Sequence, residues 1–313
     1  MEMTQAKPKP SVGSKLVKHL KKKYQLWLLA LPAIVYFIIF HYIPMYGVQI
    51  AFKDFIAFKG ILGSPWVGFK HFERFFTSYQ FGRLITNTLG ISFYQLAVGF
   101  PAPIILALLL NQTKNQKYKK FIQTLTYAPH FISVVVMVGI ILLFLSPQSG
   151  IINHMIAWTG LERINFMAEP AYFKTIYVFT GVWQSAGWGA VIYLASLSSI
   201  SPSLYEAARI DGANKWHLIR YIDMPSIMPT AVILLIMNVG RIMNVGFQKT
   251  YLMQNPLNLE SSEIIATYIY KVGLLDAQYS YSAAIGLFNT IINIILLVTV
   301  NRISRKVTET SLW

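Results

Sequence analysis

Two stretches of this chain decide how the rest of it folds: Glu206-Ala207-Ala208-Arg209-Ile210-Asp211-Gly212 and, ten residues later, Ile222-Asp223-Met224-Pro225. They belong to a polar, helix-prone run that lies between two long apolar segments. Charged side chains are costly in hydrocarbon unless they are paired or face a cavity, so a run of this length must project from the bilayer. The sequence therefore predicts a membrane protein with a structured polar loop.

The polar run itself predicts two short helices joined by a turn. Glu206 follows Ser203 by three residues, which is the spacing of a capping box at a helix N-terminus. Gly212 is placed to end this first helix, because glycine readily takes the positive φ found at helix C-termini. A second helix is expected from about Lys215 until Pro225 leads into the next apolar segment.

The composition agrees with this class of protein. Hydrophobic residues make up 55% of the chain, charged residues make up 12%, and the mean hydropathy is +0.48. Ordinary soluble domains carry about 25% charged residues. The chain has no cysteine, so disulfides, thiolate metal sites and cysteine nucleophiles are excluded. An all-α membrane protein is the expected fold class.

Six segments approach the roughly 20 apolar residues that a membrane-spanning helix needs. We expect a kink in the second at Pro101 and Pro103, and an interrupted start of the third at Pro129 and His130. One domain is predicted over 24–313, with the polar loop at 198–225 and a basic tail at 1–23. The predicted spans are 26–43, 86–111, 125–146, 175–197, 226–247 and 282–301.

The distribution of basic residues predicts the orientation. Six spans place both termini on one side, and that side carries the larger share of lysine and arginine, which is typical of the cytoplasm. The formal charge of +15 is therefore a topology and lipid-headgroup signal rather than one for nucleic acid. The basic residues of this side are Lys7, Lys9, Lys15, Lys18, Lys21, Lys22, Lys23, Lys114, Lys117, Lys119, Lys120, Arg209, Lys215, Arg220, Arg302, Arg305 and Lys306.

The chain resembles the permeases of maltose-type, binding-protein-dependent ABC importers, and more narrowly the LplB-type permeases for polysaccharides or oligosaccharides. The spacing E-A-A, three residues, G, nine residues, I-x-x-P is similar to the EAA loop of that family, with Met224 where leucine is usual. Further matching stretches are Ile43-Pro44-Met45-Tyr46-Gly47, Ala51-Phe52-Lys53-Asp54-Phe55, Gly63-Ser64-Pro65-Trp66-Val67-Gly68-Phe69, Gly99-Phe100-Pro101-Ala102-Pro103, Pro129-His130-Phe131-Ile132-Ser133, Gly187-Trp188-Gly189 and Glu309-Thr310-Ser311-Leu312-Trp313.

The resemblance implies a type I ABC importer fold in a bacterial cytoplasmic membrane. It also implies a second homologous permease, two ATPase domains that carry ATP and Mg on separate chains, an extracytoplasmic binding protein, which is a lipoprotein in Gram-positive systems, and an oligosaccharide substrate. The chain itself has no G-x-x-x-x-G-K-[ST] phosphate loop, so we expect no cofactor and no ATPase activity in it. The residues implied to couple it to the ATPase are Glu206, Ala207, Ala208, Arg209, Asp211, Gly212 and Pro225.

Polar side chains within the spans are candidates for a substrate pathway. On span five, Asn238, Arg241, Asn244 and Gln248 recur every three to four residues and so share one helix face. Amides and a guanidinium suit the hydroxyls of a sugar. On span four we add Gln184 and Trp188 as candidates. Interhelical packing and snorkelling remain the alternative roles for the span-five residues. An interfacial aromatic belt or core packing remains the alternative on span four.

Two other functions stay open at this stage. One is a self-contained carrier or channel for a small polar solute, and the other is a membrane-bound enzyme. The enzyme is the weaker alternative, because no catalytic constellation is visible and the six histidines are dispersed without the spacing of a metal site. The absence of an acidic pair within a span also argues against a proton-coupled carrier.

Overall fold

The computed structural model describes residues 23–308, and its secondary structure is helical. Over these residues, β-type pairing is confined to one antiparallel bridge between Lys53 and Trp66. The all-α fold class is thereby confirmed. Except for Lys23, the predicted basic tail lies outside the described residues, as does the Glu309–Trp313 stretch.

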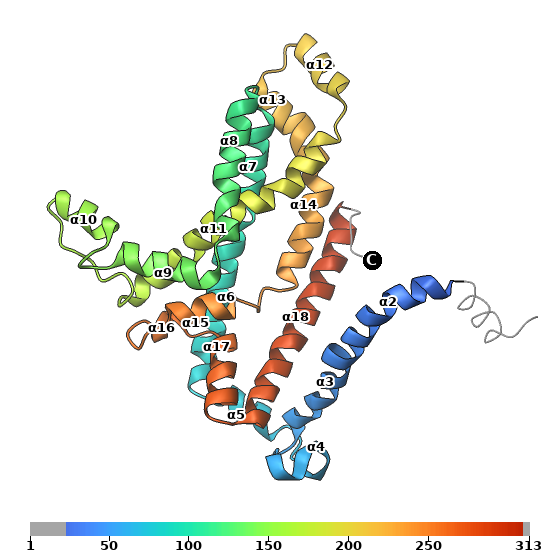
Figure 1. Cartoon of the computed structure of the whole chain (residues 1–313), viewed down its shortest axis with the longest axis vertical. Helices are drawn as coiled ribbons and strands as arrows, with labels where there is room; N and C mark the ends of the chain where they lie inside the picture. The colour runs from blue at the N-terminus through green and yellow to red at the C-terminus, as the bar shows by residue number, and fades with distance from the viewer. Residues whose placement is uncertain (1–22, 309–313) are drawn as a thin grey trace, which may run out of the picture.

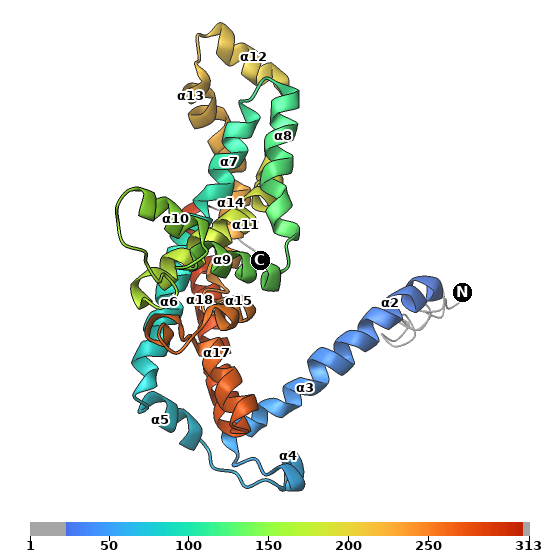
Figure 2. The ribbon, with the colours of Figure 1, turned by 60° about the vertical axis from the view of Figure 1, so that its left-hand side comes forward.

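The first apolar segment forms a rod that stands apart from the rest of the chain. Four successive helical pieces make one span over Tyr24–Phe52, and the apolar window of this span buries no residue. Two views show α2 and α3 leaning away from the other helices (Figures 1 and 2). The rod joins the body at its end, where Ala51 packs against Phe72 and Ala284. Its pieces are α2 (Tyr24–Phe37), η1 (Ile38–Tyr42), α3 (Ile43–Met45) and η2 (Tyr46–Phe52).

The second span consists of α6 (Gln80–Gly99) and α7 (Pro101–Asn111), which together cover 32 residues. The helix assignment is interrupted at Phe100, where the prolines predicted a kink. The Phe100 N–H still donates to the Leu96 carbonyl at 3.2 Å, so the chain keeps its direction through the joint.

The third predicted span is wrong as a single helix over 125–146. The chain turns by 102° between a first arm, made of α8 (Gln116–Tyr127) and η4 (Ala128–Phe131), and a second arm, α9 (Val134–Leu145). Pro129 lacks the N–H that would continue the hydrogen-bond ladder. Ser133 has extended backbone and caps the new helix, since its hydroxyl accepts from the Val136 N–H at 3.3 Å.

The long helix α11 (Pro170–Ser198) runs through the middle of the bundle. Its 29 residues span about 44 Å at 1.5 Å per residue. One end packs in a cluster with Ile91 of α6 and Met137 of α9, through Phe173. The other end packs through Tyr193 with α7 and with Ile227 of the following span. The helices that surround α11 therefore meet around its length.

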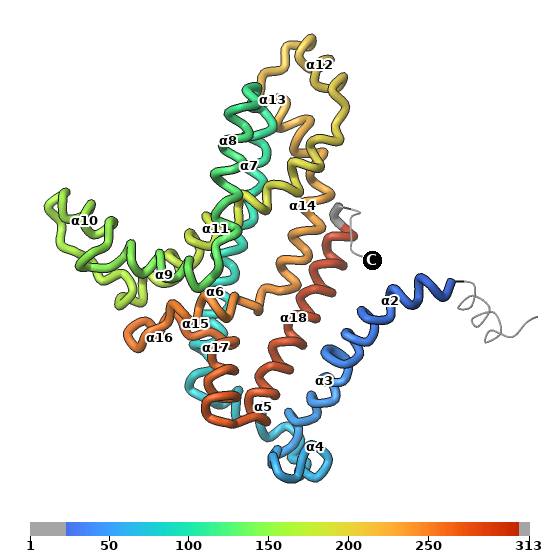
Figure 3. Tube along the Cα trace, viewed as in Figure 1, coloured from blue at the N-terminus to red at the C-terminus, as the bar shows by residue number. Residues whose placement is uncertain are grey.

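The fifth predicted span also differs from the structure. The helix α14 (Met224–Val239) ends at Val239 instead of continuing to 247. Residues 240–243 form turns, and residues 244–246 have no regular secondary structure. Figure 3 follows this connection from α14 to α15. Gly240 lies directly against Leu297, so that even a Cβ atom at this position would crowd the leucine side chain. The chain thus turns away where it meets the last helix, α18 (Tyr279–Thr308).

By length and composition, four of the described helical segments suit a membrane span, and a fifth is obtained if the bent pair counts as one. The four are Tyr24–Phe52, Gln80–Asn111, Lys215–Val239 and Tyr279–Lys306. The third of these segments begins with α13 (Lys215–Leu218) and η5 (Ile219–Asp223), which lead into α14. The remaining short helices connect the segments: η3 (Ala57–Lys59), α4 (Gly60–Gly63), α5 (Lys70–Phe76), α10 (Ile151–Trp158), α12 (Pro202–Ile210), α15 (Phe247–Met253), α16 (Leu259–Ser262), α17 (Ile265–Tyr270) and η6 (Lys271–Leu275).

Candidate functional site

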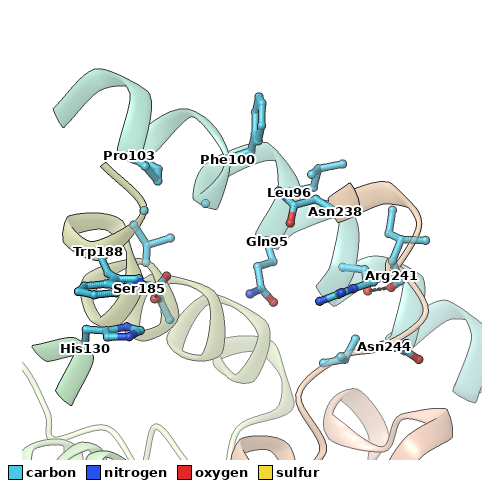
Figure 4. A pocket seen from close by; sticks show the side chains of 17 residues that line it. Gln95, Leu96, Phe100, Pro103, His130, Ser185, Trp188, Asn238, Arg241 and Asn244 are labelled. Atoms are coloured by element: carbon cyan, nitrogen blue, oxygen red, sulfur yellow. Dashed lines mark hydrogen bonds between the residues drawn. The ribbon is translucent and has the colours of Figure 1, made fainter. Parts of the chain in front are cut away.

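A cavity of about 410 Å³ lies among the central helices. Its walls come from the α6–α7 joint, the middle of α11, η4 and the stretch that follows α14 (Figure 4). The predicted pathway residues that line it are Trp188, Asn238, Arg241 and Asn244. The fold therefore brings together residues from four separate parts of the sequence.

One side of the cavity is polar. Figure 4 shows Asn238, Arg241 and Asn244 on this side, with Gln95 of α6 reaching toward them. Asn244 is held in place by α18, because its Oδ1 accepts from the Nδ2 atoms of Asn289 at 3.0 Å and Asn293 at 3.3 Å. Arg241 is exposed, and it takes part in none of the ion pairs found among residues 23–308. Its guanidinium is therefore available to a ligand.

The opposite side of the cavity is aromatic. The rings of His130 and Trp188 stack with centroids 4.7 Å apart and planes 4° from parallel. Phe131 meets Trp188 edge-on, at a centroid distance of 5.9 Å. Flat aromatic faces of this kind pack well against the apolar faces of sugar rings. His130 was not among the predicted pathway residues, although the proline beside it indicated an irregular turn.

Two glycines hold Trp188 in this position. A Cβ at Gly187 would overlap the backbone carbonyl of Thr126 on α8, and a Cβ at Gly189 would come 3.0 Å from Pro103 Cγ on α7. The two neighbouring helices therefore touch the α11 backbone on either side of Trp188, as small residues permit in membrane bundles. The indole is left to face the cavity (Figure 4).

The other two predicted pathway residues do not line the cavity. Gln184 instead donates from Nε2 to the Ile132 carbonyl at 3.0 Å, which holds the bend after η4 against α11. Gln248 lies on α15 and is exposed away from the cavity. The predicted single helical stripe is wrong, because the helix ends at Val239 before Arg241 is reached. Arg241 and Asn244 reach the cavity from the stretch that follows α14 instead.

The polar loop projects from the bundle, with α12 at the extreme end of the molecule (Figure 1). The first helix begins two positions earlier than expected, with Ser201 as N-cap and Pro202 in the first turn. Ser203 does not cap it; its hydroxyl lies 2.8 Å from that of Ser201. Gly212 has φ +82°, the conformation for which glycine was predicted. The second helix begins at Lys215, capped by Asn214.

The tip of this loop presents both charge and apolar surface. Glu206, Arg209 and Asp211 are exposed, and none of them is ion-paired among the described residues. Ile210 is 86% exposed between two of them. Of the remaining predicted loop residues, Ala207, Gly212 and Pro225 are exposed and Ala208 is half-buried. The tip of the loop therefore presents three unpaired charges and one large aliphatic side chain to its surroundings.

Comparison with known proteins identifies relatives over nearly the whole chain. Residues 99–309 match the family described as binding-protein-dependent transport system inner membrane component. The chain is 43% identical to the polygalacturonan/rhamnogalacturonan transport system permease protein YteP of Bacillus subtilis (strain 168), over 95% of this chain and 92% of that protein. It is 41% identical to protein LplB of the same organism, over 94% and 92% respectively.

Solved structures agree with these relatives. A crystal structure of a bacterial ABC transporter involved in the import of the acidic polysaccharide alginate contains a chain of the same fold. The TM-score is 0.88 at 41% identity, over 94% of this chain and 99% of that one. A second structure, of a bacterial alginate ABC transporter with its alginate pentasaccharide-bound periplasmic protein, gives the same score and identity over 95% and 100%.

Proposed function

The chain belongs to the family of binding-protein-dependent transport system inner membrane components, and we propose that the carbohydrate it transports is an acidic oligosaccharide. It is the permease subunit of an ABC importer for carbohydrate, and it lies in the cell membrane with several spans. The proposal concerns the chemistry of the substrate, the contact with the ATPase and the topology.

The observation that carries the substrate proposal is the free guanidinium of Arg241 in the central cavity. A guanidinium binds a carboxylate through two parallel hydrogen bonds, so it suits a uronic acid better than a neutral sugar. The stacked rings of His130 and Trp188 face it and offer a surface for the pyranose ring. Two similar proteins support this, since polygalacturonan/rhamnogalacturonan is named for one and the acidic polysaccharide alginate for the other.

We further propose that loop 198–225 contacts an ATPase carried on another chain. The support is the exposed charge of Glu206, Arg209 and Asp211 around Ile210, together with the turn fixed by Gly212. Closure of the ATPase subunits would then move α12 as a lever and repack the spans. ATP and Mg would bind only to those partner chains, and this chain would have no enzymatic activity of its own.

The proposed topology has six spans, with α11 as the sixth beside the five segments described above. At about 44 Å, this helix exceeds the roughly 30 Å of a hydrocarbon core. Both termini and the projecting loop then face the cytoplasm, in keeping with their basic residues. A loaded extracytoplasmic binding protein would dock on the opposite loops, which lie within 44–85, 147–174 and 248–281. A second, homologous permease would complete the pathway.

Reconstitution of the native complex in liposomes tests these proposals. The complex would contain this chain, its partner permease, the ATPase subunits and the binding protein. ATP hydrolysis and uptake would be measured with oligogalacturonate and with the same oligosaccharide after reduction of its carboxyl groups. We expect stimulation by the acidic form only. Equal stimulation by the reduced form would contradict the acidic substrate, and uptake by this chain alone, without ATPase subunits, would contradict the importer.

A further inference from the structure

A buried carboxylate lies directly beneath the projecting loop. Asp223, the last residue of η5, is 0% exposed. Its Oδ1 accepts from the Tyr205 hydroxyl at 2.5 Å and from Asn111 Nδ2 at 3.2 Å. Its Oδ2 accepts from Gln112 Nε2 at 2.7 Å. Both carboxylate oxygens are therefore used, and all three donors are uncharged.

Such a group is costly to bury. A carboxylate removed from water loses its hydration, and none of the ion pairs within residues 23–308 involves Asp223. The three hydrogen bonds offset this cost only while all three donors stay in place. The cluster therefore favours one relative position of the segments that supply it.

Those segments come from three different helical elements. Tyr205 lies on α12 of the projecting loop, and Asn111 and Gln112 lie at the end of α7. Asp223 itself stands where α14 begins. The Nδ2 of Asn111 also lies 3.3 Å from the Tyr205 hydroxyl, so the cluster is closed on itself.

Two of these helices lead to the substrate cavity. From Asn111, α7 runs back about 16 Å to Phe100, which lines the cavity. From Asp223, α14 runs about 22 Å to Asn238, which lines it from the other side. Because the cluster joins α12 to both helices, a displacement of α12 would move two walls of the cavity at once.

Packing alone does not hold α12 in place. Hollows of about 240 and 520 Å³ flank the cluster, and both are lined by Asn111, Gln112 and Arg209. Of the side-chain hydrogen bonds described for α12, those of Tyr205 are the ones that reach another helix. Burial, and then the hydrogen bond to Asp223, raise the pKa of Tyr205 to about 12, so its hydroxyl remains a donor at neutral pH.

We propose that Asp223 is the positioning residue that joins the ATPase-contacting helix α12 to the cavity-lining helices α7 and α14, with Tyr205, Asn111 and Gln112 as its partners. This inference rests on the proposed contact between loop 198–225 and an ATPase. Without the joint, α12 would move on its own and less of its motion would reach the cavity.

The test uses Tyr205→Phe as the main variant, because it removes one hydrogen bond and keeps the aromatic ring. Asp223→Asn is the second variant, since it keeps the shape but presents an amide N–H to a set of donors. Tyr118→Phe is the matched control: it makes the same change on α8, outside loop 198–225, at a side chain that is 56% exposed. All would be prepared in the full transporter complex and reconstituted with the binding protein.

Two quantities would be measured: the number of substrate molecules imported per ATP hydrolysed, and hydrogen–deuterium exchange of residues 202–210. For Tyr205→Phe and Asp223→Asn we expect a several-fold lower transport ratio and roughly tenfold faster exchange, the scale set by one hydrogen bond to a charged group. Tyr118→Phe should change neither quantity. A wild-type transport ratio with wild-type exchange in Tyr205→Phe would overturn the proposal.

The double variant Tyr205→Phe/Asp223→Asn separates a joint from two independent residues. If the two side chains act through each other, the amide protons of residues 202–210 exchange no faster in the double variant than in the more affected single variant. If the increases in exchange rate of the two single variants multiply in the double variant, the proposed joint is refuted. Hydrogen–deuterium exchange is measured without any transport. A wild-type complex that failed to couple ATP hydrolysis to import would therefore refute the proposed function, while the exchange rates would still test whether Asp223 holds α12 in place.

Discussion

Replacing three glycines of α11 by alanine, one at a time, should give a graded series of stabilities. At Gly187, a Cβ would lie well under 3.0 Å from the Thr126 carbonyl, which is backbone and cannot swing away. At Gly189 the nearest atom is Pro103 Cγ at 3.0 Å, and at Gly181 it is Lys249 Nζ at 3.4 Å, an ordinary contact. The same chemical change therefore meets three different degrees of crowding on one helix.

The magnitudes follow from two opposing terms. Alanine stabilises a helix interior by about 0.5–1 kcal/mol relative to glycine. Overpacking costs about 1–3 kcal/mol when neighbours must shift. At Gly181 the gain is kept, and at Gly189 the two terms nearly cancel. At Gly187 the clash dominates, with a net loss of about 2 kcal/mol or more. For a chain of this size, that corresponds to a Tm lower by roughly 4 °C.

The assay is thermal unfolding of the purified complex in lipid nanodiscs, followed by the elution profile of the folded complex. Expected Tm values decrease in the order Gly181→Ala, Gly189→Ala, Gly187→Ala. Uptake should fall in the same order, because Gly187 lets α8 approach α11 and so sets where His130 lies over Trp188. A Gly187→Ala variant that melts at or above Gly181→Ala would refute the close helix approach on which this reasoning depends.

Three further outcomes are expected. In uptake assays, Arg241→Gln should reduce the preference for an acidic oligosaccharide over its carboxyl-reduced form by about tenfold, which is the scale of one charge-assisted hydrogen bond in an open site. Gln248→Ala, outside the cavity, should leave this preference unchanged. Gly212→Ala should strain the loop by about 1–2 kcal/mol, because φ is +82° there although space is open, and should be seen as lower transport per ATP at an unchanged yield of complex. The hydrogen bond from Lys70 lowers the pKa of Asp54 below its ordinary value of 3.8, against a smaller opposing effect of burial. The stability this provides is present above pH 3.8 and is lost as pH falls through the lower pKa of the folded state, so Asp54→Asn should flatten the acid limb of the unfolding curve.

Local features of the projecting loop were predictable from the sequence. The turn at Gly212 and the start of the second helix at Lys215 depend on neighbouring residues, and the structure has both. The N-cap was misplaced by two residues, because Pro202 at the first helical position shifts the start to Ser201. The docking role of this loop remains a prediction.

Features that depend on distant contacts were not predictable in the same way. Hydropathy over 125–146 could not distinguish a straight span from one bent by 102°, since both are equally apolar. α14 ends at Val239 where Gly240 packs closely against Leu297, which is far along the chain. The position of His130 on Trp188 likewise requires that a proline turn and a glycine-flanked tryptophan, far apart in sequence, meet in the fold.

The cavity lies where the helices are interrupted. Phe100 marks the joint of α6 and α7, His130 belongs to the turn η4, and Arg241 and Asn244 lie in the stretch that follows α14. At membrane depth, irregular backbone is tolerated only where it is buried in protein or lines a water-filled space. The backbone polar groups freed at these interruptions therefore need a polar or water-filled space, and the interrupted segments also form the walls of that space. The side chains that line this cavity are a consequence of where the helices are interrupted. For this reason, periodicity along one ideal helix placed Gln248 wrongly while it included Arg241.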